Sequence, residues 1–244
     1  MQLIRFNPVA WTIAFAALVA AVACSTAARA AGTAYVVDTA EVGEVGNCKV
    51  EAWTSWARNR DGLVTSAPAC VVNAVPRLEF SAEISRTRTD DEWATVLAPK
   101  AKINLVPTAI GSFGWALAAG TSYDATLRET TTLYANLPGT LRLSQTARIN
   151  LNAGWLQDRL ADRHFATWGL GLDWIFAPKW STTLEAFGQL NGQHLGSETR
   201  PRFQVGIRYR PVDNFSTDLI WGRNIAGEGS DWITLSTTFR FSAL

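Results

Sequence analysis

Hydrophobic and polar side chains alternate one by one along much of this chain, most regularly over its last third. Between residues 202 and 210, one parity holds Phe203, Val205, Ile207 and Tyr209, and the other holds arginine, glutamine and glycine. A period of two is that of a β-strand, whose successive side chains point to opposite faces. The pattern therefore predicts strands with one apolar and one polar face.

The same alternation predicts about twelve strands. Their expected ranges are 49–58, 63–72, 77–86, 93–105, 113–123, 129–141, 147–155, 166–176, 180–189, 202–210, 215–224 and 232–241. Pro68 and Pro99 interrupt two of them, because proline cannot donate to a ladder. Pro138-Gly139 is expected to break the sixth, and Thr87–Asp91 is expected to be a polar loop.

An even number of such strands, joined alternately by short turns and longer loops, is typical of an outer-membrane barrel. The fold class predicted is all-β, a membrane-spanning antiparallel up-and-down β-barrel over residues 48–244. The alternative is a soluble sandwich or lipocalin-like barrel, in which the apolar parity would point inward. The 11 Trp in 244 residues favour the membrane barrel, which places aromatic girdles at both interfaces.

The N-terminus has the pattern of a secretory signal peptide, predicted over residues 1–30. Arg5 supplies a positive start, residues 11–23 an apolar core, and Ala28-Arg29-Ala30 a cleavage motif. Cys24 offers a second interpretation as a lipidation site, although Ala21 stands where a lipoprotein signal usually has a larger aliphatic residue. Either signal predicts export, and the strands then place the protein in the bacterial outer membrane.

Residues 31–47 show no clean alternation and carry three acidic residues, Asp38, Glu41 and Glu44. They are predicted to be a periplasmic lead-in that either pairs loosely or enters the lumen. Cys48 and Cys70 then fall at the same end of the first hairpin. In an oxidising compartment this pair predicts a disulfide, with two free buried thiols as the alternative.

The turn lengths predict how the barrel is oriented. The C-terminus lies on the short-turn side, which is therefore expected to be periplasmic. The longer loops are expected outside the cell, at residues 86–91, 157–163, 191–201 and 225–231.

Charged residues on the polar parity of the late strands are expected to line the lumen. These candidates are Glu185, Arg202, Arg208, Arg210, Asp218 and Arg240. Opposite charges on adjacent strands could pair and fill the lumen, or they could select solutes. A barrel of about twelve strands lies between packed and wide-channel sizes, so a narrow or plugged pore is expected.

The sequence favours neither catalysis nor nucleic-acid binding. A net charge of +1 without a basic cluster gives no reason to expect nucleic acid. The two histidines, His164 and His194, have no serine predictably beside them, so no catalytic residue is assigned. No cysteine and histidine cluster has zinc spacing, and no cofactor or metal is expected.

Three stretches carry a family resemblance: RPRFQVGIRYRPVDNFSTDLIWGRNIAGEGSDWITLSTTFRF, LNAGWLQDR and RHFATWGLGL. They resemble the bacterial outer-membrane β-barrel family labelled meta-pathway of phenol degradation. The resemblance implies a barrel that carries small aromatic or other hydrophobic solutes, and it specifies no oligomeric state.

The function predicted is a passive outer-membrane channel or transporter surrounded by outer-membrane lipid. The alternatives are a structural or adhesive barrel with a closed lumen, and an outer-membrane lipid-modifying enzyme.

Overall fold

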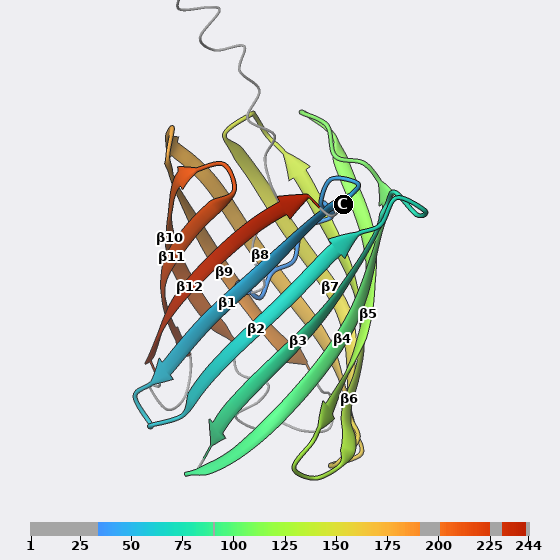
Figure 1. The fold of residues 1–244 in the computed structure, drawn as a ribbon, viewed down its shortest axis with the longest axis vertical. Coiled ribbons are helices and arrows are strands. Elements are labelled where there is room, and N and C mark those ends of the chain that lie inside the picture. Colours follow the sequence, from blue (N-terminus) through green and yellow to red (C-terminus); the bar gives the residue numbers. More distant parts are fainter. Residues whose placement is uncertain (1–33, 90, 191–200, 225–230, 243–244) are drawn as a thin grey trace, which may run out of the picture.

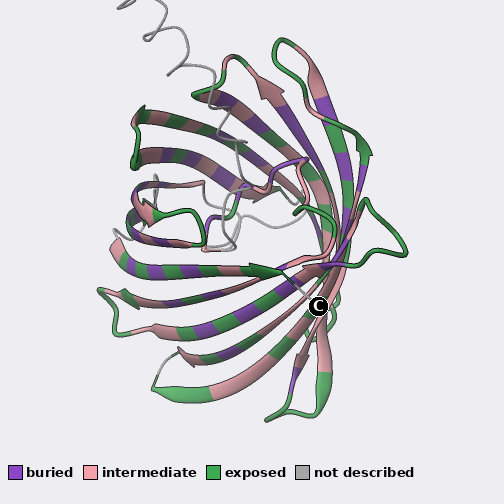
Figure 2. Ribbon diagram, turned by 45° about the horizontal axis from the view of Figure 1, so that its top comes forward, coloured by how far each residue is buried: buried purple, intermediate pink, exposed green. Residues whose placement is uncertain are grey.

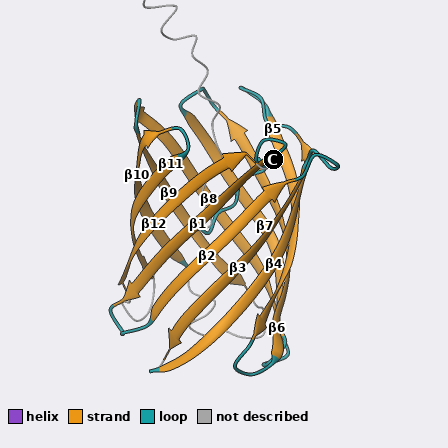
Figure 3. Cartoon of the chain, in the orientation of Figure 1, coloured by secondary structure: helices purple, strands orange, loops and turns teal. Residues whose placement is uncertain are grey.

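The computed structural model describes residues 34–89, 91–190, 201–224 and 231–242. Its strands form one closed antiparallel barrel in which neighbours in sequence pair and β1 closes on β12 (Figure 1). The strands are β1 Asn47–Ala57, β2 Gly62–Val71, β3 Leu78–Thr89, β4 Glu92–Val106, β5 Phe113–Asp124, β6 Glu129–Arg142, β7 Ala147–Asp158, β8 Arg163–Ala177, β9 Trp180–Leu190, β10 Arg202–Val212, β11 Phe215–Asn224 and β12 Asp231–Ser242. The predicted all-β up-and-down barrel is confirmed (Figure 3).

The apolar parity of each strand faces away from the barrel axis. In β8, Leu170 and Trp174 are 49% and 51% exposed, whereas Phe165, on the opposite parity of the same strand, is 4% exposed. Charged and polar side chains such as Lys102 and Asp218 are buried inside instead. Exposed and buried residues alternate in bands along the strands (Figure 2). This arrangement is the reverse of a soluble barrel and is that of a membrane-spanning one.

In the described part of the chain, no helix is long and apolar enough to cross a membrane.

Prolines interrupt the ladders without ending the strands. The β2–β3 register has no pairs between Ser66 and Ala69, around Pro68, and the β4–β5 register lapses around Pro99. The prediction that Pro138-Gly139 breaks the sixth strand is wrong, because β6 continues through both residues. Only its pairing with β5 lapses, at Leu137 and Pro138, while β7 pairs throughout. A proline removes one donor, and the second neighbour holds the strand.

A second difference concerns the expected loop at residues 87–91. β3 extends to Thr89, which pairs with Glu92 of β4, so the connection is tighter than predicted. The barrel then has two distinct ends. The turn end carries the start of β1, the end of β12 and the short connections 143–146, 178–179 and 213–214. The loop end carries the connections at the other end of the strands, from β1 to β2, from β3 to β4 and so on to β11 and β12.

The predicted disulfide between Cys48 and Cys70 is confirmed. The two cysteines are directly opposite in the β1–β2 register. The bond therefore links the first two strands at the turn end, beside the seam where β1 meets β12.

Candidate functional site: the barrel lumen

The lumen is crossed by residues 34–46, which we call the plug. The plug precedes β1 and forms no strand. Its backbone amides donate to inward side chains of the wall: Val36 and Val37 to Glu185 at 2.9 and 3.2 Å, and Ala40 to the Thr140 hydroxyl at 2.9 Å. A buried segment outside the ladder must satisfy its N–H groups in this way. The inward side chains therefore act as the plug's hydrogen-bonding partners.

Two acidic residues of the plug form ion pairs with different parts of the wall. Asp38 contacts Lys100 at 2.7 Å and Lys102 at 2.9 Å, both from β4. Burial alone would raise the pKa of Asp38, but the two lysines hold that pKa well below its ordinary range. The Asp38 carboxylate is therefore the ionised centre of a lysine clamp.

Glu41 has a corresponding clamp of arginines. Its carboxylate lies 2.5 Å from both Arg142 of β6 and Arg148 of β7. Arg148 also contacts Asp173 of β8 at 2.7 Å, so the clamp is tied into the wall. Charge-assisted contacts of this kind are the strong class of hydrogen bonds.

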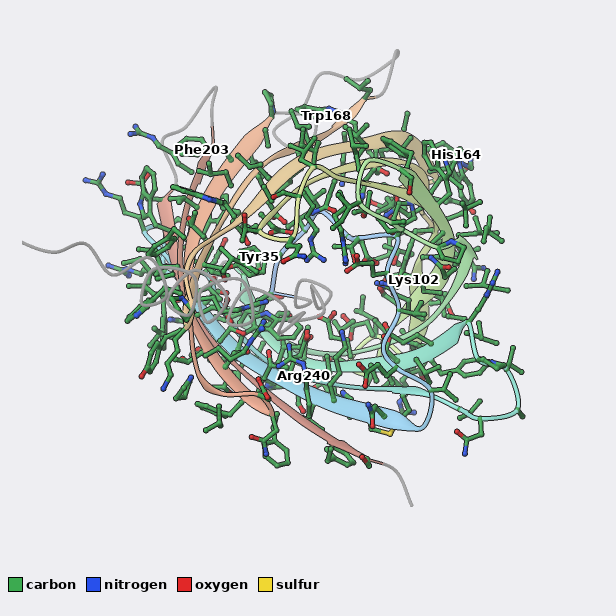
Figure 4. The ribbon with its side chains drawn as sticks, turned by 90° about the horizontal axis from the view of Figure 1, so that it is seen from above. Tyr35, Lys102, His164, Trp168, Phe203 and Arg240 are labelled. Atoms are coloured by element: carbon green, nitrogen blue, oxygen red, sulfur yellow. A yellow bond between two sulfur atoms is a disulfide. The ribbon has the colours of Figure 1, made fainter. Side chains whose placement is uncertain are left out.

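Small residues in the wall provide space for the plug's larger side chains. The ring of Tyr35 lies against Gly206, where any Cβ would overlap the phenol. A Cβ at Gly169 would lie 2.9 Å from Val37, which is closer than real contacts allow. The Tyr35 hydroxyl donates to Asp218 at 3.1 Å. Tyr35 and Lys102 lie inside the ring of strands (Figure 4).

The structure places three of the predicted lumen residues against the plug. Arg208 donates to Asp218 at 2.7 Å across the β10–β11 pair, and both are buried. Glu185 is also buried, but its partners are the plug amides and Gln204 rather than an arginine. Arg202, Arg210 and Arg240 each line a separate cavity, and the cavity at Arg210 is not one of the three described next.

Three cavities follow one another beside the plug. The first, of about 340 Å³, lies toward the loop end and is lined by Val36, Asp38, Lys100 and Tyr134 among others. The second, of about 210 Å³, shares those four residues and adds Lys49 and Glu79. The third, of about 360 Å³, shares Lys49 and Glu79 and lies at the turn end. Adjacent cavities thus share walls from one end of the barrel to the other.

The histidines do not contribute to this lumen in the described residues. His164 is exposed on the outer face, where its ring stacks on Trp155 with centroids 5.6 Å apart. Figure 4 shows His164, Trp168 and Phe203 on the outside of the ring. His194 lies outside the described residues. Within the described ranges, no group of three or more histidine, cysteine or acidic residues could hold a metal ion.

The lead-in prediction left the plug's contacts unidentified. A signal was present, because three acidic residues precede the first strand and the inward parity of β4 carries Lys100 and Lys102. The plug occupies part of the space that the small wall residues Gly169 and Gly206 leave.

Solved structures with a similar fold are outer-membrane barrels. The KdgM porin in complex with disordered oligogalacturonate has 9% identity and a TM-score of 0.64, covering 79% of this chain and 99% of that one. The COG4313 outer membrane channel from Pseudomonas putida F1 has 12% identity and a TM-score of 0.56, covering 82% and 97%. The translocator domain of autotransporter NalP from Neisseria meningitidis has 11% identity and a TM-score of 0.52, covering 96% and 97%.

Identities this low establish the fold alone. No curated protein sequence matches this chain. A family model described as "Uncharacterised conserved protein UCP029691" matches residues 18–241. That description does not confirm the narrower resemblance to the phenol-degradation family.

Proposed function

This chain belongs to that family of uncharacterised conserved proteins, and from its structure we propose a passive outer-membrane channel for small solutes with a plugged lumen. The observation that carries the proposal is the series of three cavities that share lining residues beside the plug. A barrel built only as a scaffold would need no such series of spaces. The proposed route runs beside the plug and is therefore narrow.

The outward face supports placement in a lipid bilayer. Leu170, Trp174 and Phe239 are each about half exposed on the outer surface, where water would be an unfavourable neighbour. Outer-membrane lipid is the neighbour that such a face fits. In this placement the turn end is periplasmic and the loop end is extracellular. Residues 1–30 serve as the export signal, and they lie outside the described residues.

The solutes proposed are small, and aromatic or hydrophobic compounds are the preferred class. The cavity nearest the loop end includes Tyr134, Leu156 and Phe187 in its lining, so it offers apolar surface that a water-filled pore would lack. Two of the similar structures are named as a porin and as an outer-membrane channel, which supports passage through a barrel of this fold.

Reconstitution tests the proposal directly. The protein purified from outer membranes should give small, discrete conductance steps in planar bilayers and should admit small aromatic solutes into liposomes. Absence of both conductance and uptake would overturn the channel and favour the structural or adhesive barrel. Turnover of labelled phospholipid that disappears in His164→Ala would instead favour the lipid-modifying enzyme.

A further inference from the structure

The cavity toward the loop end, which we call the vestibule, combines an apolar wall with a cationic group. The register places Tyr134 of β6 opposite Leu156 of β7, and Leu156 opposite Phe165 of β8, so three large side chains form one row. Tyr134 and Leu156 line the cavity itself. This row gives one side of the vestibule a surface suited to a hydrocarbon or aromatic body.

Small residues next to that row also line the vestibule. They are Thr167 and Gly169 of β8, and Val37 of the plug fills the space beside Gly169. Val36 and Asp38 of the plug also line the vestibule, beside Lys100. Its volume of about 340 Å³ falls at the lower end of the range for small-molecule pockets.

Arg202 lines the side of the vestibule opposite the plug's clamps. It stands directly across from Phe187 in the β9–β10 register, and both residues line the cavity. Among the residues that the structure describes, no carboxylate forms an ion pair with Arg202, whereas Lys100 is paired with Asp38. A half-buried guanidinium beside an aromatic ring favours a ligand that brings its own anion.

From this juxtaposition we propose that the vestibule binds a small apolar carboxylate, whose body contacts Tyr134, Leu156 and Phe187 and whose carboxylate pairs with Arg202. The site rests on the proposed channel, for which it names the solute class. The guanidinium donates two parallel N–H bonds to the two carboxylate oxygens, and the aromatic and aliphatic walls cover the body. A neutral analogue keeps only the wall contacts.

Ligand-observed ¹⁹F NMR with 4-(trifluoromethyl)benzoate tests the site on the full barrel in lipid nanodiscs, with 4-(trifluoromethyl)benzyl alcohol as the neutral probe. The carboxylate should bind at least tenfold more tightly than the alcohol. Arg202→Gln should weaken carboxylate binding by roughly ten- to a hundredfold, the range expected for a lost charge-assisted pair, and leave alcohol binding unchanged. Arg210→Gln is the matched control at the other end of β10, and it should leave both probes unaffected.

A short fluorinated alkanoate separates the two sources of an apolar carboxylate. If it competes with the benzoate, both have access, and if it does not, the site is restricted to aromatic acids; either result supports the shared chemistry. Equal binding of acid and alcohol, or an equal loss in Arg210→Gln and Arg202→Gln, would overturn the site. Salt conductance of the same preparations keeps the two proposals apart. Conductance without selective binding removes the site alone, and binding without conductance removes the channel alone.

Discussion

Tyr35 lies directly against Gly206 inside the barrel, in a space that no other residue at position 206 would leave open. The contact joins the plug to the middle of β10, and the Tyr35 hydroxyl extends it to Asp218 of β11. The seat of the plug is thus built from the absence of one side chain in the wall. A side chain added at position 206 should therefore displace the plug without altering any charge.

Gly206→Val should displace Tyr35 and raise the conductance of single channels, because the new side chain occupies the position of the phenol ring. The measurement is single-channel recording in planar bilayers. In a Tyr35→Ala background the same substitution should add little, since the overlap is already relieved. Lower conductance in Gly206→Val would show that the valine narrows the route more than the plug does, contrary to the proposed seat.

Asp38→Asn should loosen the plug and shift the channel toward anions. The substitution leaves Lys100 and Lys102 in the lumen without their shared carboxylate. Reversal potentials in a salt gradient measure the shift in selectivity, and open probability measures the loosening. Asp91→Asn, which removes a carboxylate that pairs with Arg88 at the loop end, is the control and should behave as the native protein. A selectivity change of equal size in that control would contradict the clamp.

The lysine clamp also predicts a pH response. Lys100 and Lys102 hold the pKa of Asp38 below its ordinary value of 3.8, so the clamp's stabilisation is present above that pH and is lost only as pH falls through the lower folded value. In a Glu41→Gln background, which removes the arginine clamp, the conductance should therefore stay constant from neutral pH down to about 4.

Replacing both lysines by glutamine in the same background should reverse this behaviour. Burial would then raise the pKa of Asp38 above its ordinary value with no cation to oppose it. The plug should then be loosest at neutral pH and should close as acid protonates Asp38, as recorded by a fall in conductance during acid titration. Identical titration curves in the two proteins would show that Asp38 is not the group that holds the plug.

The strands could be predicted from the sequence because their signal is local. Alternation along each strand fixes which side chains share a face, and one assumption about the direction of the apolar face then determines the whole wall. The interruption expected at Pro138 was wrong because strand continuity there depends on β7, a neighbour that pairs through the proline. The Cys48–Cys70 bond could be predicted from the sequence because both cysteines lie within one hairpin.

The plug could not be placed in this way because its contacts join residues far apart in the sequence. Asp38 meets Lys100 and Lys102, and Val36 donates to Glu185, across distances that no periodicity spans. Only the charges hinted at the pairing, with acids before the first strand and inward cations after it. Glu185 was expected only to line the lumen, and its partners are backbone amides of the plug and Gln204.

The disulfide should stabilise the barrel by holding β1 to β2. Cys48 and Cys70 are 22 residues apart, and a loop of that size predicts a stabilisation of roughly 2–4 kcal/mol. Reduction should lower the urea midpoint of the native protein in detergent micelles. It should leave the midpoint of a Cys48→Ser/Cys70→Ser variant unchanged, and a fall in both would mean that the reductant acts elsewhere.

Leu170→Arg should destabilise the barrel in phospholipid vesicles by about 2–4 kcal/mol, the cost of a cation near the bilayer midplane on the lipid face. Leu170 is exposed near the centre of β8, so in a membrane it faces hydrocarbon. Leu160, which is 54% exposed in the turn between β7 and β8, is the matched control, because an arginine there reaches water. Urea unfolding monitored by tryptophan fluorescence compares the two variants. Equal, small effects would mean that Leu170 faces water, and the outward apolar surface would then need an explanation other than lipid.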